Sequence, residues 1–223
     1  GRLEQLALAV VDLHTGTLGH LRLWANPSAF GGFLPELLAS YAARHPEVKI
    51  NLEDSLSEDA VRAVLSGAAE LAIIGENTPS EGLETFICDV DELVLITPSG
   101  HPLAASRPAA FTAALDYDFV TLARTASLTR KIFAAAEGAG RVLRIRVQAR
   151  SFDAICRMVA AGLGLSILPG AGAPLYARAL GLAVTPLTGL DSQRRLLVAM
   201  RSGAALSPAA QALVEMIKAR NRA

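Results

Sequence analysis

Cysteine is scarce in this chain, which has only Cys88 and Cys156 among its 223 residues. These two residues form no CxxC pair and are too few for a disulfide framework, which excludes a small secreted domain held together by disulfides. Two isolated cysteines are typical of buried apolar positions in a protein of a reducing compartment. The sequence therefore predicts a cytoplasmic protein.

Targeting signals are also lacking. The first residues have neither the basic start nor the continuous apolar run of a signal peptide, and without an initiator methionine the chain is expected to be a fragment. The uncharged run at 158–177 is long enough to span a membrane, but four glycines and two prolines interrupt it. It predicts a helix end, a buried strand and a turn instead.

Motifs for catalysis or cofactor binding are missing from the sequence. It has no GxSxG motif and no P-loop, and GLGLSI at 162–167 lacks the third glycine of a dinucleotide-binding loop. The four histidines show no metal-ligand spacing, and His45 and His101 each precede a proline, as turn residues do. We therefore expect no catalytic residues, no cofactor and no metal site.

An excess of charge of one sign is lacking as well, since 21 Lys and Arg balance 21 Asp and Glu. The composition thus predicts no direct binding to nucleic acid or to a membrane. The distribution is uneven, however: residues 1–100 hold five basic and 15 acidic side chains, and residues 101–223 hold 16 and six. Two interpretations stay open, namely two solvated surfaces of different composition, or two portions that attract across a cleft or an oligomer contact.

Short apolar runs alternating with amphipathic helical runs are what the chain has in abundance. After a helix at 3–13, the first half predicts strands at 21–25, 48–52, 71–74, 83–90 and 92–97, and helices ending near His45 and Gly67. The second half predicts helices at 109–115, 128–137, 151–161, 174–179 and 208–220, and strands at 119–122, 142–149, 165–168, 182–187 and 195–200. This order predicts an α/β fold of two lobes, with the last strand and helix returning to the first lobe.

Five segments, taken together, resemble the effector-binding domain of LysR-type transcriptional regulators in that family's order and spacing. They are LRLWANPSAFGGFLPELLASYAARHPEVKINL, SEDAVRAVLSGAAELAII, ELVLITPSGHPLA, SFDAICRMVAAGLGLSILP and LSPAAQALVEMI. The resemblance implies two Rossmann-like lobes joined by a two-crossing hinge, as in type 2 periplasmic binding proteins. It assigns the end of a linker helix to 1–15, lobe I to 16–97 plus 197–223, and lobe II to 98–196.

The resemblance also implies partners. A small effector would bind between the lobes, and DNA binding would belong to the family's N-terminal winged helix-turn-helix domain, which these residues do not include. Two effector domains would pair antiparallel as a homodimer, with a tetramer of the full-length protein left open. The charge distribution would then favour contacts of Arg144, Arg146 and Arg150 with Glu36, Glu53 or Asp54 of the partner, around an apolar contact that includes the helix at 33–44.

Candidate site residues lie where strands end and helices begin. Helix N-termini offer unpaired N–H groups that suit anions, and four hydroxyls fall at such places: Ser28, Ser57, Ser127 and Ser151. The family pattern assigns them to the effector cleft, whereas the alternative for each is a plain helix cap. Further candidates are Asn26 and Pro27 in the first loop, Thr97 at the first crossing, Arg124 as a counter-charge, Thr125 beside it, and Phe152 against the ligand or in the core.

The function predicted is therefore an effector-sensing domain that binds a small anionic metabolite and has no enzymatic activity. The alternative is a periplasmic solute-binding protein of a transporter, which has the same fold. An enzyme would need a nucleophile and a base in the cleft, and the sequence contains no motif for such a pair.

Overall fold

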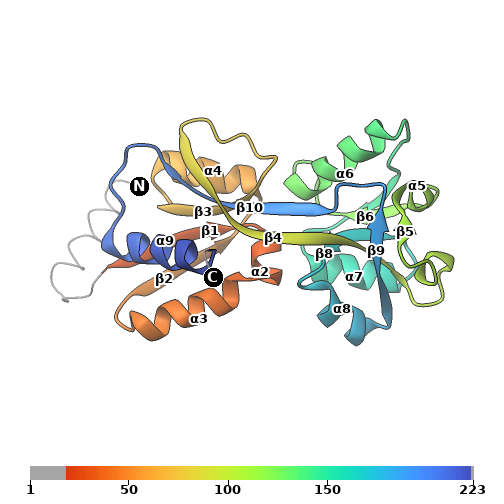
Figure 1. Cartoon of the computed structure of the whole chain (residues 1–223), viewed down its shortest axis with the longest axis horizontal. Helices are drawn as coiled ribbons and strands as arrows, with labels where there is room; N and C mark the ends of the chain where they lie inside the picture. The colour runs from red at the N-terminus through yellow and green to blue at the C-terminus, as the bar shows by residue number, and fades with distance from the viewer. Residues whose placement is uncertain (1–18, 222–223) are drawn as a thin grey trace.

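The structure is a computed structural model that describes residues 19–221, and two lobes lie side by side along its long axis (Figure 1). Each lobe has its own hydrophobic core. The linker segment predicted at 1–15 lies outside the described residues. The mixed α/β architecture that the sequence predicted is confirmed.

The helices and strands follow the predicted order. In chain order they are β1 (His20–Ala25), α2 (Pro27–Gly31), α3 (Leu34–Arg44), β2 (Lys49–Asp54), α4 (Ser57–Ser66), β3 (Leu71–Gly75), β4 (Leu83–Pro98), the 3-10 turn η1 (Pro102–Ala104), β5 (Ala109–Ala110), α5 (Phe111–Ala114), β6 (Phe119–Thr121), α6 (Ser127–Gly138), β7 (Ile145–Gln148), α7 (Phe152–Ala160), β8 (Ser166–Pro169), α8 (Ala173–Leu180), β9 (Leu182–Thr188), β10 (Gln193–Arg201) and α9 (Pro208–Arg220). Most predicted elements appear within a few residues of their expected ends.

Lobe I is a sheet covered on both faces. Strands β2, β1 and β3 are parallel, and β10 joins β3 antiparallel. Because side chains alternate along a strand, Leu21 and Leu23 of β1 point to one face and pack with α3 and α9. On the other face, Ala60 and Val64 of α4 pack against Ala72 of β3. Helix α9 thus returns the end of the chain to the lobe in which the described chain begins.

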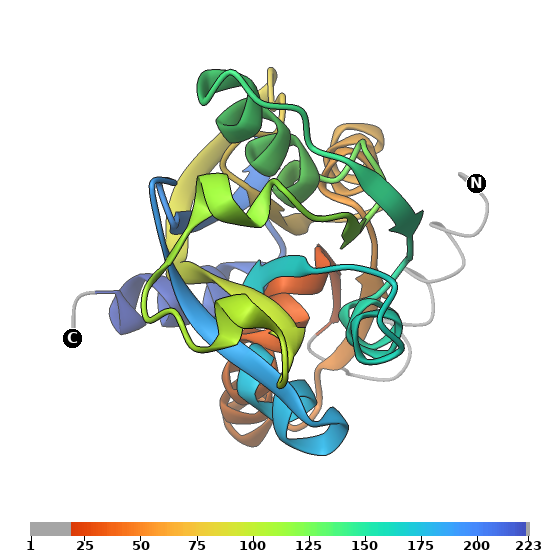
Figure 2. The same cartoon turned by 90° about the vertical axis from the view of Figure 1, so that its right-hand side faces the viewer.

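Lobe II combines the far half of β4 with β8, β9 and β5, and a separate parallel pair, β6 and β7. Its core is apolar, with Phe111 and Phe119 fully buried, and it also contains the buried, unbonded Cys156. In Figure 2, where lobe II faces the viewer, α6 and α8 lie on opposite sides of this lobe. Helix α6 is the one whose first turn reaches toward lobe I.

Strands β4 and β10 carry the chain between the lobes. Strand β4 pairs with β10 up to Glu92 and with β8 and β9 from Leu93 onward. The prediction of two strands, at 83–90 and 92–97, is wrong, because β4 continues through Asp91. The Asp91 carboxylate accepts hydrogen bonds from the backbone N–H groups of Glu92 and Ala171, so a polar residue is satisfied there without a turn.

The helix predicted at 33–44 is confirmed as α3. The short helix α2 before it was not predicted, and it ends because Gly32, at φ −115° and ψ −122°, leaves helical geometry. One further expectation needs correction. Thr97 does not lie at the crossing. It is fully buried inside lobe II, paired with Ala183 of β9, because the partners of β4 change five residues earlier.

Candidate functional site

Helices α4 and α6 begin opposite each other at the junction of the lobes. Their first residues are Ser57 and Ser127, both 3% exposed, and the two Oγ atoms are 3.4 Å apart. Ser57 is not the cap that the sequence predicted, because Leu56 occupies the capping position of α4. Ala126 occupies the capping position of α6, and neither Leu56 nor Ala126 can form a side-chain cap. Both hydroxyls are therefore free to bond across the junction.

The lobe I side of the junction is well satisfied. Asn26 caps α2 by accepting from the Ala29 N–H, and its Nδ2 donates to Ser57 Oγ at 3.1 Å. The Gly75 N–H donates to the same oxygen at 3.1 Å. A hydroxyl has two acceptor lone pairs and one proton, so Ser57 is left to donate that proton toward Ser127.

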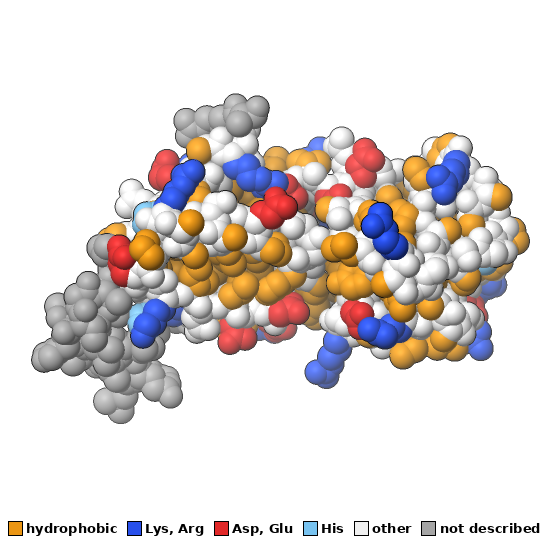
Figure 3. Space-filling model, turned by 90° about the horizontal axis from the view of Figure 1, so that it is seen from below, with side chains coloured by type: hydrophobic (Ala, Val, Ile, Leu, Met, Phe, Trp, Pro, Cys, Tyr) orange, Lys and Arg blue, Asp and Glu red, His pale blue; other side chains and the backbone are white. Residues whose placement is uncertain are grey.

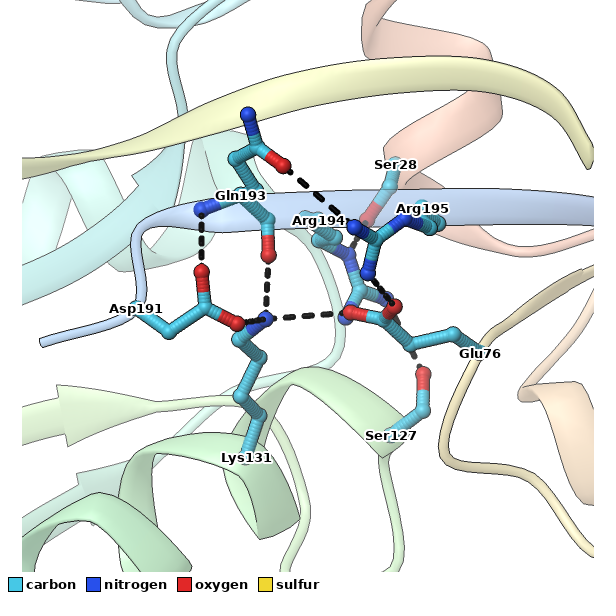
Figure 4. A network of polar contacts seen from close by, with 8 residues as sticks. All are labelled: Ser28, Glu76, Ser127, Lys131, Asp191, Gln193, Arg194 and Arg195. Atoms are coloured by element: carbon cyan, nitrogen blue, oxygen red, sulfur yellow. Dashed lines mark hydrogen bonds and ion pairs between the residues drawn. The ribbon is translucent and has the colours of Figure 1, made fainter.

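Arg194 occupies the centre of this cluster (Figure 4), and sequence reasoning missed it. Its side chain is 2% exposed, its Nε donates to Ser28 Oγ at 3.2 Å and its Nη2 donates to Ser127 Oγ at 2.9 Å. Its Nη1 has no hydrogen-bond partner. Within residues 19–221, no carboxylate lies close enough to form an ion pair with Arg194.

The environment of Arg194 is unusual for a guanidinium. Burial lowers the pKa of Arg194 to about 10, although the charges of Glu76 and Asp91 oppose the change. The group is still positive at neutral pH, because that pKa remains far above 7. A buried positive charge without a paired carboxylate is costly, which marks this position as a candidate for binding an anion.

The position of Arg194 follows from strand parity. Along β10 the buried residues include Arg194, Leu196 and Val198, every second residue. An arginine in phase with the buried face of a strand points inward. That signal was present in the sequence QRRLLVAM, and the predicted strand at 195–200 started one residue too late to reveal it.

Gly75, the last residue of β3, makes the close approach possible. A Cβ atom at this position would lie 2.4 Å from Ser127 Oγ and 2.9 Å from Arg194 Nη2. Both distances are shorter than van der Waals contact, so any side chain here would push α6 away. The glycine is needed for the space it leaves and not for an unusual backbone angle.

A second polar network lies beside the first and is fully charge-paired (Figure 4). Lys131 Nζ is 3.0 Å from Glu76 Oε1 and 3.3 Å from Asp191 Oδ2, and Arg195 Nη1 is 3.2 Å from Glu76 Oε2. Burial acts to raise the pKa of Glu76, but Lys131 and Arg195 outweigh it and hold that pKa below its ordinary value. Glu76 is therefore ionised and already engaged, so it leaves Arg194 unpaired.

A pocket of about 1000 Å³ opens at the junction next to the Arg194 cluster. Its walls come from both lobes: Trp24, Pro27, Glu53, Asp54, Ser55, Leu56, Asp59, Arg62, Ala63, Ser66, Ala68, Leu122, Ala123, Ala149 and Arg150. Pro27 and Leu56 directly precede Ser28 and Ser57, so this pocket is adjacent to the cluster. Burial raises the pKa of Asp54 above its ordinary value.

The remaining predicted site residues lie elsewhere. Arg124 is exposed, with its guanidinium carbon 4.4 Å from the centre of the Phe133 ring of α6, and Thr125 is exposed next to it. Ser151 is a plain cap of α7, accepting from the Ala154 N–H at 3.2 Å. Phe152 is 6% exposed in the core of lobe II and lines a small cavity with Gly31 of lobe I.

Comparison with known sequences identifies the family. The family described as LysR substrate binding domain matches residues 14–222. The chain belongs to this family. The RuBisCO operon transcriptional regulator of Allochromatium vinosum is 26% identical over 215 residues, which are 96% of this chain and 71% of that protein. The transcriptional activator LysR of Escherichia coli is 28% identical over 205 residues, 89% of this chain and 59% of that protein.

The chain spans only part of its curated relatives, for example 56% of a probable RuBisCO transcriptional regulator of Trieres chinensis, which is 27% identical over 74% of this chain. Solved structures show the same fold. The regulatory domain of Synechocystis CcmR in complex with 2-PG has a TM-score of 0.82 at 24% identity, covering 91% of this chain and 97% of that one. The effector-binding domain of QuiR in complex with shikimate has a TM-score of 0.82 at 18% identity, covering 92% and 97%.

These findings confirm a LysR effector-binding domain with the type 2 periplasmic-binding-protein-like fold. The family is one of transcriptional regulators and not of enzymes, which favours the regulator over the solute-binding alternative. Between residues 19 and 221, no cluster of three or more potential metal ligands is found. No helix in that part of the chain has the length and apolar character to cross a membrane.

Proposed function

We propose that this chain senses a small anionic metabolite between its lobes, with Arg194 as the counter-charge. The observation that carries the proposal is a surplus of hydrogen-bond donors. Arg194 Nη1 is buried and has no partner, and Ser28 and Ser127 already accept from Arg194, which leaves their own protons to donate. A carboxylate or phosphate oxygen is the acceptor that such a site lacks.

Two helix N-termini support an anion at this place. Helices α4 and α6 have ten and 12 residues, and neither has a side-chain cap, so their free N–H groups and dipoles favour a negative charge. The adjacent pocket adds a constraint, because the three carboxylates of Glu53, Asp54 and Asp59 outnumber the two guanidinium groups of Arg62 and Arg150 in its lining. These carboxylates disfavour a second anionic group and favour hydroxyl or ammonium groups at the far end of the ligand.

The predicted residues divide accordingly in this proposal. Asn26, Ser28, Ser57 and Ser127 form the polar end of the effector site, and Pro27 lies where the adjacent pocket begins. Arg194 takes the role assigned to Arg124. Thr97, Arg124, Thr125 and Ser151 have no part in binding, and Phe152 acts as a packing residue at the edge of the junction.

The response would pass to a DNA-binding domain. The proposal is that effector binding changes the angle between the lobes about β4 and β10, and that a winged helix-turn-helix domain of the longer protein reads this change on DNA in the cytoplasm. Support comes from the family and from a full-length relative: CbnR, solved with its target DNA, has a TM-score of 0.81 over 98% of this chain and 77% of that one.

A thermal-shift screen with matched serine variants tests the binding site. Lactate, glycine and inorganic phosphate should raise the melting temperature in proportion to the logarithm of their concentration, and malonate, with two carboxylates, should do so less. Ser28→Ala should reduce the response several-fold, because it removes one donor. Ser151→Ala should cost about 1 kcal/mol of stability as a lost cap and leave the response intact. Equal responses in the two variants would refute the site.

The partner we propose is a second copy in antiparallel arrangement. Strand β2 is at one edge of the large sheet and β7 is at the edge of the β6–β7 pair, and unpaired edges are surfaces available for pairing. The exposed residues of β2 include Glu53 and Asp54. On the other lobe, Arg144, Arg146 and Arg150 are exposed just before, within and after β7. Arg144 Nε is 3.3 Å from Asp118 Oδ1 of the same chain, and Arg146 Nη1 is 3.9 Å from Asp118 Oδ2. These two arginines are therefore less available to pair with a partner.

An apolar part of the same contact is available. Figure 3, seen from the side of α3 and α8, shows a band of hydrophobic side chains across both lobes with charged residues around it. The exposed residues of these helices are mainly apolar and include Pro35, Ala39, Ala42, Ala43, Pro174, Leu175 and Ala179. This surface agrees with an apolar contact that involves the helix predicted at 33–44.

Sedimentation analysis of the chain at micromolar concentration should show a dimer that weakens modestly as salt rises, because exposed charges are screened and each exposed ion pair contributes only about 0–1 kcal/mol. Charge reversal at Arg150→Glu should weaken the dimer further. Arg201→Glu, at an exposed position at the end of β10 and outside the elements proposed for the contact, serves as the matched control. A monomer at every concentration would refute the dimer, and indifference to salt would refute its electrostatic part.

A further inference from the structure

The first five residues of α6 attach lobe II to lobe I. Ser127 contacts Ser57 at 3.4 Å, as described above. Arg130 forms an ion pair with Glu58 at the start of α4, and its Nη2 donates to the Asn77 carbonyl at 3.1 Å. Lys131 forms an ion pair with Glu76 directly after β3. Two of these attachments are ion pairs that do not involve the Arg194 cluster.

The Lys131–Glu76 pair is the more shielded of the two. The side chains are 9% and 17% exposed, compared with 30% and 36% for Arg130 and Glu58. Charges removed from water are screened less by salt, and breaking such a pair costs more than breaking an exposed one. Lys131 also contacts Asp191, just before β10, at 3.3 Å, so it links α6 to the strand that crosses between the lobes.

The contacts of α6 with lobe I hold the two lobes together at the effector site and so compete with effector binding. Ser57 and Ser127 are in contact, and Arg194 is 2% exposed. Arg194 Nη1 is itself buried, so an anion can reach it only after neighbouring groups move, and the contact of α6 with α4 is the part of this enclosure that joins the two lobes. If the effector site is the one proposed above, the ligand separates the lobes at this point instead of drawing them together.

We propose that Arg130 and Lys131 form a latch that keeps the effector site shut and so determines the apparent affinity for the effector. Only the part about affinity rests on the proposed function, because the latch itself is a property of the ligand-free chain. When the binding-competent state is a minor population, the apparent affinity falls by that fraction. Loss of one latch pair should raise the open fraction, and with it the affinity.

The ligand-free chain gives the first test. Spin labels at Ser66→Cys on α4 and Ala134→Cys on α6, both exposed positions, report the distance between the two helices, while Cys88 and Cys156 are buried and remain unlabelled. Lys131→Met should lengthen this distance or broaden its distribution toward longer values. Arg130→Gln, which breaks the more exposed of the two pairs, should do so to a smaller extent.

Titration with inorganic phosphate gives the second test. Phosphate should bind Lys131→Met roughly tenfold more tightly than the unaltered chain, as expected when a latch that holds most molecules shut is released. Arg157→Gln, which removes an exposed ion pair with Asp153 inside lobe II, is the matched control and should change neither the distance nor the affinity.

Two results would overturn the latch: an unchanged distance in both latch variants, or weaker phosphate binding by a variant whose distance has lengthened. A lengthened distance with no phosphate binding by any variant would refute the anion site and support the latch. The two proposals can therefore fail separately.

Discussion

Replacing Arg194 with methionine is expected to abolish stabilisation by anions while leaving the ligand-free chain at least as stable as before. The guanidinium is buried without a carboxylate partner, and its Nη1 makes no hydrogen bond, so its desolvation is only partly offset by the bonds to Ser28 and Ser127. Replacing buried ion pairs with well-packed apolar side chains is often neutral or stabilising by about 1–4 kcal/mol, because the desolvation cost of the charges is removed. We expect a gain of about 0–2 kcal/mol here, because the two serine contacts are lost.

Chemical denaturation with and without phosphate measures both effects. For the unaltered chain, a ligand at 100 times its Kd adds about 2.7 kcal/mol of stability, and Arg194→Met should lose this increment entirely. Arg201→Met, at the exposed end of the same strand, is the control and should keep it. A variant at Arg194 that is strongly destabilised and still responds to phosphate would show that the residue is structural.

Replacing Ser127 with cysteine should create a thiol with an unusually low pKa, independent of any ligand. Its sulfur would take the place of an oxygen that lies 2.9 Å from Arg194 Nη2 at the first residue of α6. Burial opposes ionisation, but a neighbouring guanidinium and a helix N-terminus together bring thiol pKa values down to about 3.5–7.5. We therefore expect the pKa of this thiol to fall at least about one unit below the ordinary 8.5.

The native cysteines do not interfere with this measurement. Burial, followed by the charge of Asp89, raises the pKa of Cys88 far above its ordinary value, and burial with the charge of Asp153 raises the pKa of Cys156 to about 11. Ultraviolet absorbance of the thiolate as a function of pH would thus report the new residue alone in the neutral range. Adding Arg194→Met should raise its pKa, because the positive neighbour is gone.

A second variant separates the two causes. Ser151→Cys places a thiol at the capping position of α7, where the helix N-terminus is exposed and no arginine contacts the Ser151 hydroxyl. Its pKa should be lowered less than that of the thiol at position 127. If Ser127→Cys has the same pKa with and without Arg194, the positive potential that we assign to the site is absent.

Much of the fold was determined by local sequence. Strands such as β1 and β3 are short apolar runs bounded by polar or small residues, and helices such as α9 begin at an explicit signal, with Ser207 as cap and Pro208 in the first turn. These features act over a few residues, so periodicity and capping residues predict them. The errors arose where a long-range contact replaced a local rule. Strand β4 continues through Asp91 because Asp91 and Glu92 pair with Arg194 and Gln193 of β10, which are distant in the chain.

The candidate site was determined by sequence only in part. The loop and helix-start residues Asn26, Ser28, Ser57 and Ser127 were predicted because strand ends and helix starts can be located locally, and the structure brings them together. Which serine caps its own helix could not be predicted. Ser151 does so, whereas Ser57 and Ser127 lie one position inside their helices, and a shift of one residue is below what sequence patterns resolve.

Only the tertiary structure decided which arginine carries the counter-charge. The sequence has many arginines, and Arg124 lies only three residues before Ser127, yet its guanidinium stacks on Phe133 at the surface. Arg194 is 166 residues from Ser28 and 67 from Ser127, and it meets both because β10 crosses between the lobes. Local sequence determines which face of a strand a side chain occupies, but the electrostatics of a buried charge depend on every group folded around it.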